Sequence, residues 1–180
     1  MLIEFIKRHK PGQIWVLFLE EYLGPMVRWI PGYEGMFIRW LFYKMTFKHL
    51  GKKALIWPSV YITHSYNMVV GRYLAINRGA HIDGRGGIEI GDYVLIGPNV
   101  FIGSSNHIVP PVKDRPRIFL GHTPEPVKIG NNVWIGANAI ICPGVSIGDN
   151  SVIGAGSVVV TNVPASVAAA GSPARVIKEF

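Results

Sequence analysis

Histidine is the side chain best suited to move protons near neutral pH, and this chain of 180 residues contains six. One of them, His107, lies in the segment IGSSNH, at the point where a regular pattern of aliphatic residues stops. A histidine held there could act as a general base that removes the proton of an attacking hydroxyl group. The single thiol, Cys142, has no histidine in its own segment IICPGV to activate it, so we expect it to be structural.

The aliphatic pattern that positions these residues repeats every six residues. Neither an α-helix, with a period of about 3.6, nor an ordinary strand, with a period of about 2, requires that interval. Each unit predicts a short strand followed by a tight corner, where Gly, Asn or Asp tolerates unusual backbone angles. The fourteen inward positions are Ile56, Ile62, Val70, Ile76, Ile82, Ile90, Ile96, Ile102, Ile129, Ile135, Ile141, Ile147, Ile153 and Val159.

Three such units close a triangular coil of about 18 residues, and successive coils stack through parallel backbone ladders. Each coil then buries its aliphatic residues only against its neighbours, as in other solenoids. Fourteen units correspond to between four and five coils. A β-sandwich would instead show irregular spacings of about 8–12 residues with alternating polarity. The sequence therefore predicts an all-β, parallel solenoid.

The period is interrupted at one corner of this coil. Two residues are inserted after Ile62 and again after Ile82, 20 residues later, so both insertions fall on the same corner. The longer gap between Ile102 and Ile129 falls on that corner in the next coil. We therefore predict that residues 104–126 form a loop extruded from one edge, with His107 near its base. Long loops in compact domains are usually functional.

Residues 1–53 have a different composition, with 11 of the 20 aromatic residues and nine Lys/Arg against four Asp/Glu. Apolar stripes predict helices over residues 13–23 and 34–51, with Gly24-Pro25 and Gly51 as stop signals. Helices there would cap the open first coil. The mixture of aromatic and basic residues also favours peripheral membrane contact through residues 1–50. The longest apolar run has six residues, far below the ~20 that span a bilayer.

Other compositional features narrow the class of protein. A single cysteine excludes a disulfide framework and fits a reducing compartment. The first residues, MLIEFIKRHK, lack the features of a secretory signal, so we expect a cytoplasmic protein, peripheral at most to the inner face of a membrane. The net charge is +7, but no helix-turn-helix, RNA-binding or zinc-finger pattern accompanies it, and we expect no nucleic-acid partner.

The segment VKIGNNVWIGANAIICPGVSIGDNSVIGAGSVVVTNVP, with the following ASVAAAGSPARVIK, resembles the hexapeptide-repeat acyltransferases. The likeness covers residues 56–180 and is strong to galactoside and maltose acetyltransferases and to enzymes that O-acetylate polysaccharides. It implies a left-handed parallel β-helix, a handedness that the period alone does not give. It also implies a homotrimer with active sites between neighbouring subunits, and acetyl-CoA as cosubstrate.

The expected organisation follows from the repeat and the resemblance together. Residues 1–53 form a helical cap, residues 54–164 form the β-helix with the loop at 104–126, and residues 165–180 form a tail that contributes to coenzyme A binding.

The resemblance assigns His107 as the catalytic base and Asn77, in LAINRG, as its partner in the acceptor site. Asp83 and Arg85, in the longer corner IDGRGG, and His122, in the loop, are expected to bind the acceptor. Relatives carry an acidic residue where Arg85 falls, so the pattern of sugar contacts differs here.

For coenzyme A, the resemblance implies that the Trp134 indole covers the pantetheine arm. Backbone amides near Gly136, Ala137 and Ala155 would bond the pantetheine amides, and one of them could stabilise the tetrahedral oxyanion.

Basic residues near the C-terminus are expected to meet the nucleotide phosphates of the same ligand. Arg175 and Lys178, in GSPARVIK, match the family's basic positions. Val160 and Thr161 stand where relatives carry Thr-Lys, so one phosphate contact is missing there or is supplied elsewhere.

These features favour an O-acetyltransferase that modifies a sugar hydroxyl in the synthesis of a bacterial surface polysaccharide. An N-acetyltransferase acting on an amino-sugar nucleotide or an antibiotic would use the same base. A non-catalytic scaffold is less consistent with His107 on its loop. A carbonic-anhydrase-like protein is also less consistent, because the related anhydrase has two metal-binding histidines five residues apart and no histidines here have that spacing. We therefore expect no metal. His9 and His49 should be surface residues, and His64 and His81 should lie on outward faces.

Overall fold

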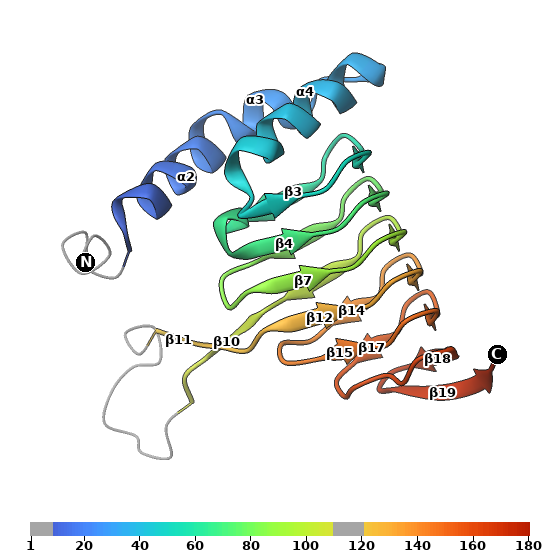
Figure 1. Cartoon of the computed structure of the whole chain (residues 1–180). Helices are drawn as coiled ribbons and strands as arrows, with labels where there is room; N and C mark the ends of the chain where they lie inside the picture. The colour runs from blue at the N-terminus through green and yellow to red at the C-terminus, as the bar shows by residue number, and fades with distance from the viewer. Residues whose placement is uncertain (1–8, 110–120) are drawn as a thin grey trace.

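The structure is a computed structural model that describes residues 9–109 and 121–180. Stacked coils form a three-sided column, and helices cover its N-terminal end (Figure 1). Almost all strand pairs in the column are parallel, which confirms the predicted solenoid. None of the helices in the described part of the chain is both long and apolar enough to cross a membrane.

Three sheets form the sides of the column. Sheet 1 contains β1 (His49–Leu50), β4 (Met68–Val70), β7 (Ile88–Ile90), β12 (Val127–Ile129) and β15 (Ser146–Ile147). Sheet 2 contains β2 (Leu55–Ile56), β5 (Ala75–Ile76), β8 (Leu95–Ile96), β13 (Trp134–Ile135), β16 (Val152–Ile153), β18 (Val167–Gly171) and the antiparallel β19 (Ala174–Glu179). Sheet 3 contains β3 (Tyr61–Thr63), β6 (His81–Asp83), β9 (Phe101–Gly103), β14 (Ile140–Ile141) and β17 (Val158–Val159).

The corners between strands stack into three edges. The edge between sheets 3 and 1, here called the hairpin edge, contains residues 64–67, 84–87, 104–109, 121–126, 142–145 and 160–162. The edge between sheets 2 and 3, here called the asparagine edge, contains residues 57–60, 77–80, 97–100, 136–139 and 154–157. The third edge, between sheets 1 and 2, contains residues 51–54, 71–74, 91–94, 130–133 and 148–151.

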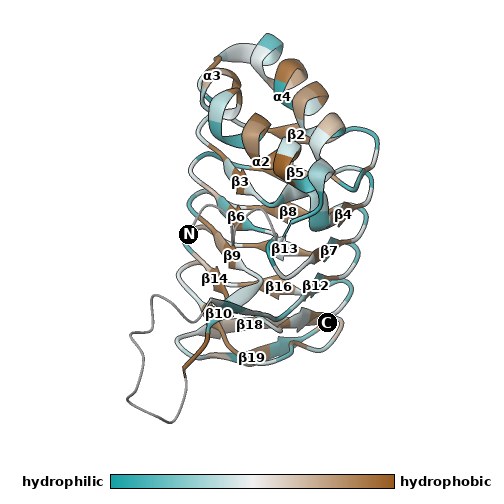
Figure 2. Ribbon diagram, turned by 90° about the vertical axis from the view of Figure 1, so that its left-hand side faces the viewer, coloured by the Kyte–Doolittle hydropathy of each residue, from teal (hydrophilic) through white to brown (hydrophobic). Residues whose placement is uncertain are grey.

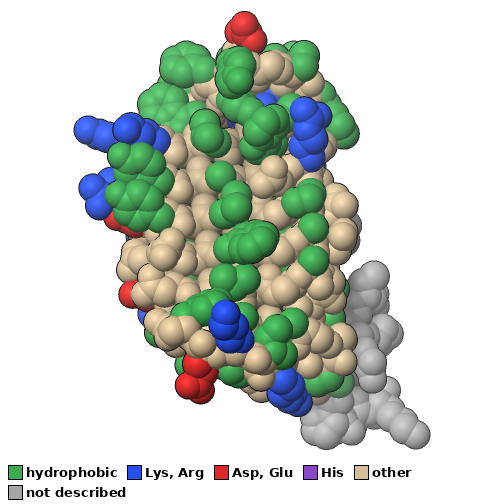
Figure 3. Space-filling view, turned by 90° about the vertical axis from the view of Figure 1, so that its right-hand side faces the viewer, with side chains coloured by type: hydrophobic (Ala, Val, Ile, Leu, Met, Phe, Trp, Pro, Cys, Tyr) green, Lys and Arg blue, Asp and Glu red, His purple; other side chains and the backbone are tan. Residues whose placement is uncertain are grey.

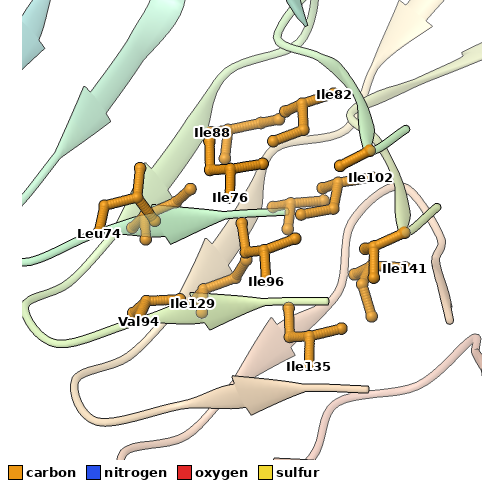
Figure 4. Packing of buried hydrophobic residues seen from close by; sticks show 14 of the residues in the cluster. Leu74, Ile76, Ile82, Ile88, Val94, Ile96, Ile102, Ile129, Ile135 and Ile141 are labelled. Atoms are coloured by element: carbon orange, nitrogen blue, oxygen red, sulfur yellow. The ribbon is translucent and has the colours of Figure 1, made fainter. Parts of the chain in front are cut away.

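Columns of aliphatic side chains fill the interior of the β-helix (Figure 4). In sheet 2, isoleucines pair in register from coil to coil, and each of them is 0% exposed. Full burial of such a side chain contributes about 1.5–3 kcal/mol. This column consists of Ile56, Ile76, Ile96, Ile135 and Ile153.

Close approach of neighbouring coils explains the small or polar residues at the corners. A Cβ at Gly97 would lie 2.8 Å from the carbonyl oxygen of Ile135 in the next coil, so a side chain there would push the coils apart. Asn99 and Asn138 adopt left-handed backbone angles, with φ of 56° and 58°. The Asn99 side chain donates a hydrogen bond to that of Asn138, at 3.2 Å, and ties two corners together.

The β-helix is longer than the sequence pattern indicated. Six parallel strands stack in sheet 2, against the four to five coils expected, because β18 adds a rung after Pro164. At the other end, β1 pairs with β4 and adds a strand to sheet 1. The predicted helix over residues 34–51 is therefore too long. It ends at Thr46, since Phe47 is extended and His49–Leu50 form the first strand of sheet 1.

Three helices make up the cap: α2 (Pro11–Tyr22), α3 (Gly24–Arg28) and α4 (Gly32–Thr46). The fully buried Arg39 of α4 joins the cap to the first coil. Its Nε donates to the carbonyl oxygen of Ile56 at 2.8 Å, and its Nη1 donates to those of Ile30 at 2.7 Å and Val27 at 3.2 Å. One side chain thus satisfies backbone acceptors from three segments.

A second buried group, Glu20 of α2, seats the cap on the hairpin edge. Its carboxylate accepts bonds from the backbone N–H groups of His64 and Ser65, at 2.9 and 2.8 Å, and from the Ser65 hydroxyl at 2.5 Å. Burial raises the pKa of Glu20, although the bonds from Ser65 oppose that shift.

We predict that Arg39→Ala lowers the free energy of unfolding by about 3 kcal/mol, because it leaves a cavity and three acceptors without their donor. Met45→Ala, at a residue of the same helix that is 65% exposed, should change it by less than about 0.5 kcal/mol. Urea unfolding followed by circular dichroism measures both. Equal losses in the two variants would show that Arg39 does not hold the cap.

Candidate functional site

The predicted loop leaves the β-helix as a two-stranded hairpin of β10 (Ser105–His107) and β11 (His122–Pro124) (Figure 1). It emerges at the hairpin edge, in the coil after the corners at 64–67 and 84–87, as the spacing of the insertions predicted. Residues 110–120 of the predicted loop lie outside the described residues. The antiparallel register places His107 directly opposite His122.

Buried Ser104 fixes the root of the hairpin. Its hydroxyl donates to the carbonyl oxygen of Asp83 at 2.7 Å and accepts from the N–H of Gly86 at 2.9 Å. The N–H of Glu125, on the returning strand, donates to the Ser104 carbonyl at 2.8 Å. Both ends of the hairpin are thereby attached to the preceding coil.

The two histidines of the hairpin are in contact, with ring centroids 4.1 Å apart. Arg85 Nη1 lies 2.9 Å from His122 Nδ1. A guanidinium can only donate, so Nδ1 is the acceptor and the proton of His122 resides on Nε2. Burial lowers the pKa of His122, and the charges of Arg85 and of His107 lower it further. His122 is therefore neutral at neutral pH.

Asp83 organises the groups beneath this pair. Its Oδ1 lies 2.9 Å from His64 Nδ1 and accepts a bond from the Arg85 N–H at 3.0 Å, while its Oδ2 lies 3.8 Å from Arg85 Nε. Burial alone would raise the pKa of Asp83, but the hydrogen bond with His64 and the nearby charges outweigh it and lower the pKa. The ionised carboxylate thus holds Arg85 toward His122.

His64 does not lie on an outward face as the sequence suggested. It is only 9% exposed, because the inserted corner turns back with φ of 55° and the ring packs against the Asp83 carboxylate. Glu20 and Ser104 also take part here, although neither was predicted from the sequence. For His64 and Ser104 the sequence does carry one indication of a role: each is the first residue of a corner on the hairpin edge, where the insertions stack.

Asn77 lies on a different edge from His107. It follows β5 on the asparagine edge, where its side-chain Nδ2 donates to the carbonyl oxygen of Ile96 at 3.1 Å. Sheet 3 separates this edge from the hairpin edge, so one chain does not bring Asn77 and His107 together. Any site that uses both must be completed by a second copy of the chain.

The residues expected along the pantetheine arm lie on the same edge as Asn77 or on the adjoining sheet 2, in later coils. Trp134 is 53% exposed on the outward face of sheet 2. The Gly136 N–H donates to the Ile153 carbonyl at 2.8 Å as part of the ladder, so this amide is already engaged. Among the described residues, the N–H groups of Ala137 and Ala155 have no acceptor, and both lie on the asparagine edge.

The residues expected to meet the nucleotide phosphates are divided between two regions. Arg175 and Lys178 lie on β19, at the end of sheet 2. Val160 and Thr161 are exposed at the hairpin edge, after β17. One chain therefore places the basic pair on the Trp134 side and the other two residues below the hairpin.

Outward side chains differ between the sheets. A column of hydrophobic side chains runs down the face shown in Figure 3. The exposed apolar residues of sheet 2 include Leu55, Leu95 and Trp134. In sheet 1 the outward positions include the ion pair of Lys128 and Glu89, at 3.3 Å. The apolar surface thus borders the asparagine edge.

Two other predictions concern Cys142 and metal binding. Cys142 is partly buried against the core, and burial raises the pKa of its thiol, as expected for a structural residue. Within residues 9–109 and 121–180, no group of three His, Cys, Asp or Glu side chains is arranged to hold a metal ion.

We predict that Arg85→Met raises the pKa of His122 toward its ordinary value of about 6.5, because the variant removes a charge that disfavours protonation. Arg72→Met, which breaks an ion pair with Asp92 on the third edge, serves as the matched control. NMR titration of the histidine ring protons measures the shift. An unchanged His122 titration in Arg85→Met would contradict the contact.

Comparison with known proteins groups this chain with enzymes of one repeat type. A family model described as bacterial transferase hexapeptide (six repeats) matches residues 126–161. The galactoside O-acetyltransferase of Escherichia coli (strain K12) is 44% identical over 137 residues, which are 76% of this chain and 66% of that enzyme. The aligned region thus spans slightly less than two thirds of that relative. The putative colanic acid biosynthesis acetyltransferase WcaF of the same strain is 32% identical over 130 residues, 72% of this chain and 68% of that protein.

Similar solved structures include a galactoside acetyltransferase in complex with coenzyme A. It matches with a TM-score of 0.83 and 38% identity, and the alignment covers 94% of this chain and 83% of that chain. The match confirms the predicted left-handed β-helix. The shared repeat, the sequence identity and the common fold together show that this chain belongs to the hexapeptide-repeat acyltransferase family.

Proposed function

We propose that this protein transfers an acetyl group from acetyl-CoA to a hydroxyl group of a sugar, with His107 as the general base. The family, a relative named galactoside O-acetyltransferase, and a similar structure with bound coenzyme A support this reaction. The observation that carries the assignment is the position of His107. It projects on a hairpin beyond the wall of the β-helix, where a substrate can reach it.

The reaction needs two proton transfers, one from the acceptor to His107 and one from His107 to the leaving thiolate. The His107 imidazole takes the proton of the acceptor hydroxyl while the hydroxyl oxygen attacks the thioester carbonyl carbon. The tetrahedral intermediate then expels the coenzyme A thiolate, which receives the proton from the imidazolium. The products are the acetyl ester and free coenzyme A, and no group on the protein is acylated. An N–H group of Ala137 or Ala155 is suited to stabilise the oxyanion.

The groups around His107 are suited to bind the acceptor. The Arg85 side chain is 40% exposed and can donate to sugar oxygens, and neutral His122 can donate from Nε2. Asp83 is mostly covered and bonded to His64, so we assign it the role of holding Arg85 in place. Arg85 thus stands at the position where relatives carry an acidic side chain, and Asp83 supports it.

Two neighbouring copies form each site in this proposal, within a homotrimer. One copy contributes His107 from its hairpin, and the other contributes Asn77 from its asparagine edge. The apolar outward residues that border the asparagine edge support such packing, because exposed apolar surface of this kind often marks an interface. The amide oxygen of Asn77 is suited to hold the acceptor or its reacting hydroxyl.

Coenzyme A would lie along the cleft between the two copies. The exposed Trp134 indole is suited to cover the pantetheine arm, and Arg175 and Lys178 are suited to meet the phosphates. Gly136 lies beside this path, but a Cβ there would lie 2.6 Å from the Ala155 nitrogen of the next coil, and its N–H is engaged in the ladder. Val160 and Thr161 supply no cationic side chain, so they form a neutral part of the wall.

The cellular setting of this reaction is proposed to be the synthesis of a bacterial surface polysaccharide. The similarity to a protein named for colanic acid biosynthesis supports that setting. Such a reaction would take place in the cytoplasm, with residues 1–50 in peripheral contact with the inner face of the membrane.

We predict that His107→Ala reduces acetyl transfer at least about a hundredfold, because it removes the base. Coenzyme A binding, measured by calorimetry, and the mass of the oligomer, measured by ultracentrifugation, should not change. His49→Ala, on the exposed strand β1, is the matched control and should keep full activity. Activity of His107→Ala within tenfold of the unaltered protein would exclude the proposed mechanism.

A further inference from the structure

The cap exposes aromatic side chains where a water-facing helix normally carries polar ones. On α2, Trp15, Phe18 and Tyr22 form one continuous row, with exposed fractions of 60%, 46% and 65%. Their rings lie 5.6 Å and 4.5 Å apart, from centroid to centroid. The opposite side of α2, which includes Glu20, faces the β-helix. This helix is therefore apolar on its outward side.

The longer cap helix, α4, also carries apolar side chains on its outward side and a charged one on its buried side. On α4, Arg39 and Tyr43 are buried against the first coil. Its exposed side carries large apolar residues at every fourth position, with exposed fractions of 86%, 62%, 47% and 65%. These residues are Tyr33, Phe37, Leu41 and Met45.

Exposed large apolar side chains are concentrated in the cap. Of the 24 large hydrophobic side chains exposed in the described residues, 11 lie between Trp15 and Met45. The rest are spread over the much longer remainder of the chain. A concentration of this kind on a stable domain marks a surface that contacts something other than water.

The charge of the cap distinguishes between two possible partners of this surface, a second copy of the chain and an anionic lipid surface. The exposed charged side chains between His9 and Lys53 are five lysines and two glutamates, Glu21 and Glu34. A second copy of the same face would bring like charges together, whereas anionic lipid headgroups would be attracted. Trp and Tyr also prefer the boundary between headgroups and hydrocarbon. The lysines are Lys10, Lys44, Lys48, Lys52 and Lys53.

We propose that the outward faces of α2 and α4 bind the surface of a membrane that contains anionic lipids. The helices lie on the bilayer with their aromatic residues at the headgroup boundary and the lysines against the phosphates. The long axis of the column then points away from the membrane, because the cap covers only one end of it (Figures 1 and 2).

This orientation also restricts the class of acceptor, an extension that rests on the proposed acetyl transfer. Glu20 attaches α2 to the corner at His64 and Ser65, and the hairpin leaves the same edge two rungs further along the column. Two ladder spacings are about 10 Å. A glycan attached to a membrane lipid would therefore extend along the hairpin edge toward His107. The acceptor class is a glycan carried on a membrane lipid.

Vesicle flotation with the full chain tests the membrane contact. Vesicles of phosphatidylcholine with about 30% phosphatidylglycerol should carry the protein upward at low salt, and pure phosphatidylcholine vesicles should carry at least about fivefold less. The variant W15S/F18S/Y22S should bind the anionic vesicles at least about tenfold less than the unaltered chain. The variant Y73S/Y93S, which removes two exposed stacked rings from the third edge, is the matched control and should bind normally.

A second variant keeps the test decisive if the aromatic variant does not fold. K48Q/K52Q removes two exposed charges and should weaken binding several-fold to anionic vesicles only. Failure of the unaltered chain to float, or equal flotation of all variants, would overturn the proposal. A loss of oligomer mass in W15S/F18S/Y22S would also overturn it, because the face would then be an interface between copies.

Acetyl transfer to a soluble sugar is assayed separately on the same preparations. W15S/F18S/Y22S should keep that activity but lose at least about tenfold with a lipid-linked glycan in vesicles. Flotation without any transfer would leave the membrane contact standing and reject the proposed reaction. Transfer to soluble sugar without flotation would reject the membrane contact alone, and equal losses with both acceptors would reject the lipid-linked class.

Discussion

The stacking of aliphatic side chains between successive coils is the interaction on which the rest of this molecule depends. A coil of this size has no core of its own, so Ile76 is buried only because Ile56 and Ile96 lie on either side of it. The ladder fixes the sides of the column but leaves the corners free. The register of Ile90 with Ile129 and of Ile102 with Ile141 is therefore kept, although the whole hairpin is inserted between them in the chain.

The freedom of the corners explains where chemistry is placed. His107, Arg85 and the His64–Asp83 pair all belong to the hairpin edge, where stacked insertions provide length and polar side chains. Asn77 and the free amides of Ala137 and Ala155 belong to the asparagine edge. A three-sided column separates its edges by a full sheet. An active site that needs both sets of groups therefore requires two copies of the chain.

Most of the fold could be predicted from the sequence, because a six-residue period reports directly on which side chains point inward. The hairpin was predictable as well, since the insertions after Ile62 and Ile82 mark its edge. The pairing of Glu20 with the His64 corner was not, because helix packing joins residues whose spacing in sequence carries no period. The first and last rungs, at Leu50 and Val167, were missed where helix and tail signals hide the repeat.

The central claim is that His107 of one copy acts with Asn77 of its neighbour. The direct test is to co-express His107→Ala with Asn77→Ala, each inactive alone, and to assay the mixed oligomers for acetyl transfer. Random assembly leaves both residues intact in about one quarter of the sites between copies, so about a quarter of the normal activity should return. Mixed oligomers as inactive as their parents, with normal mass and coenzyme A binding, would contradict the account.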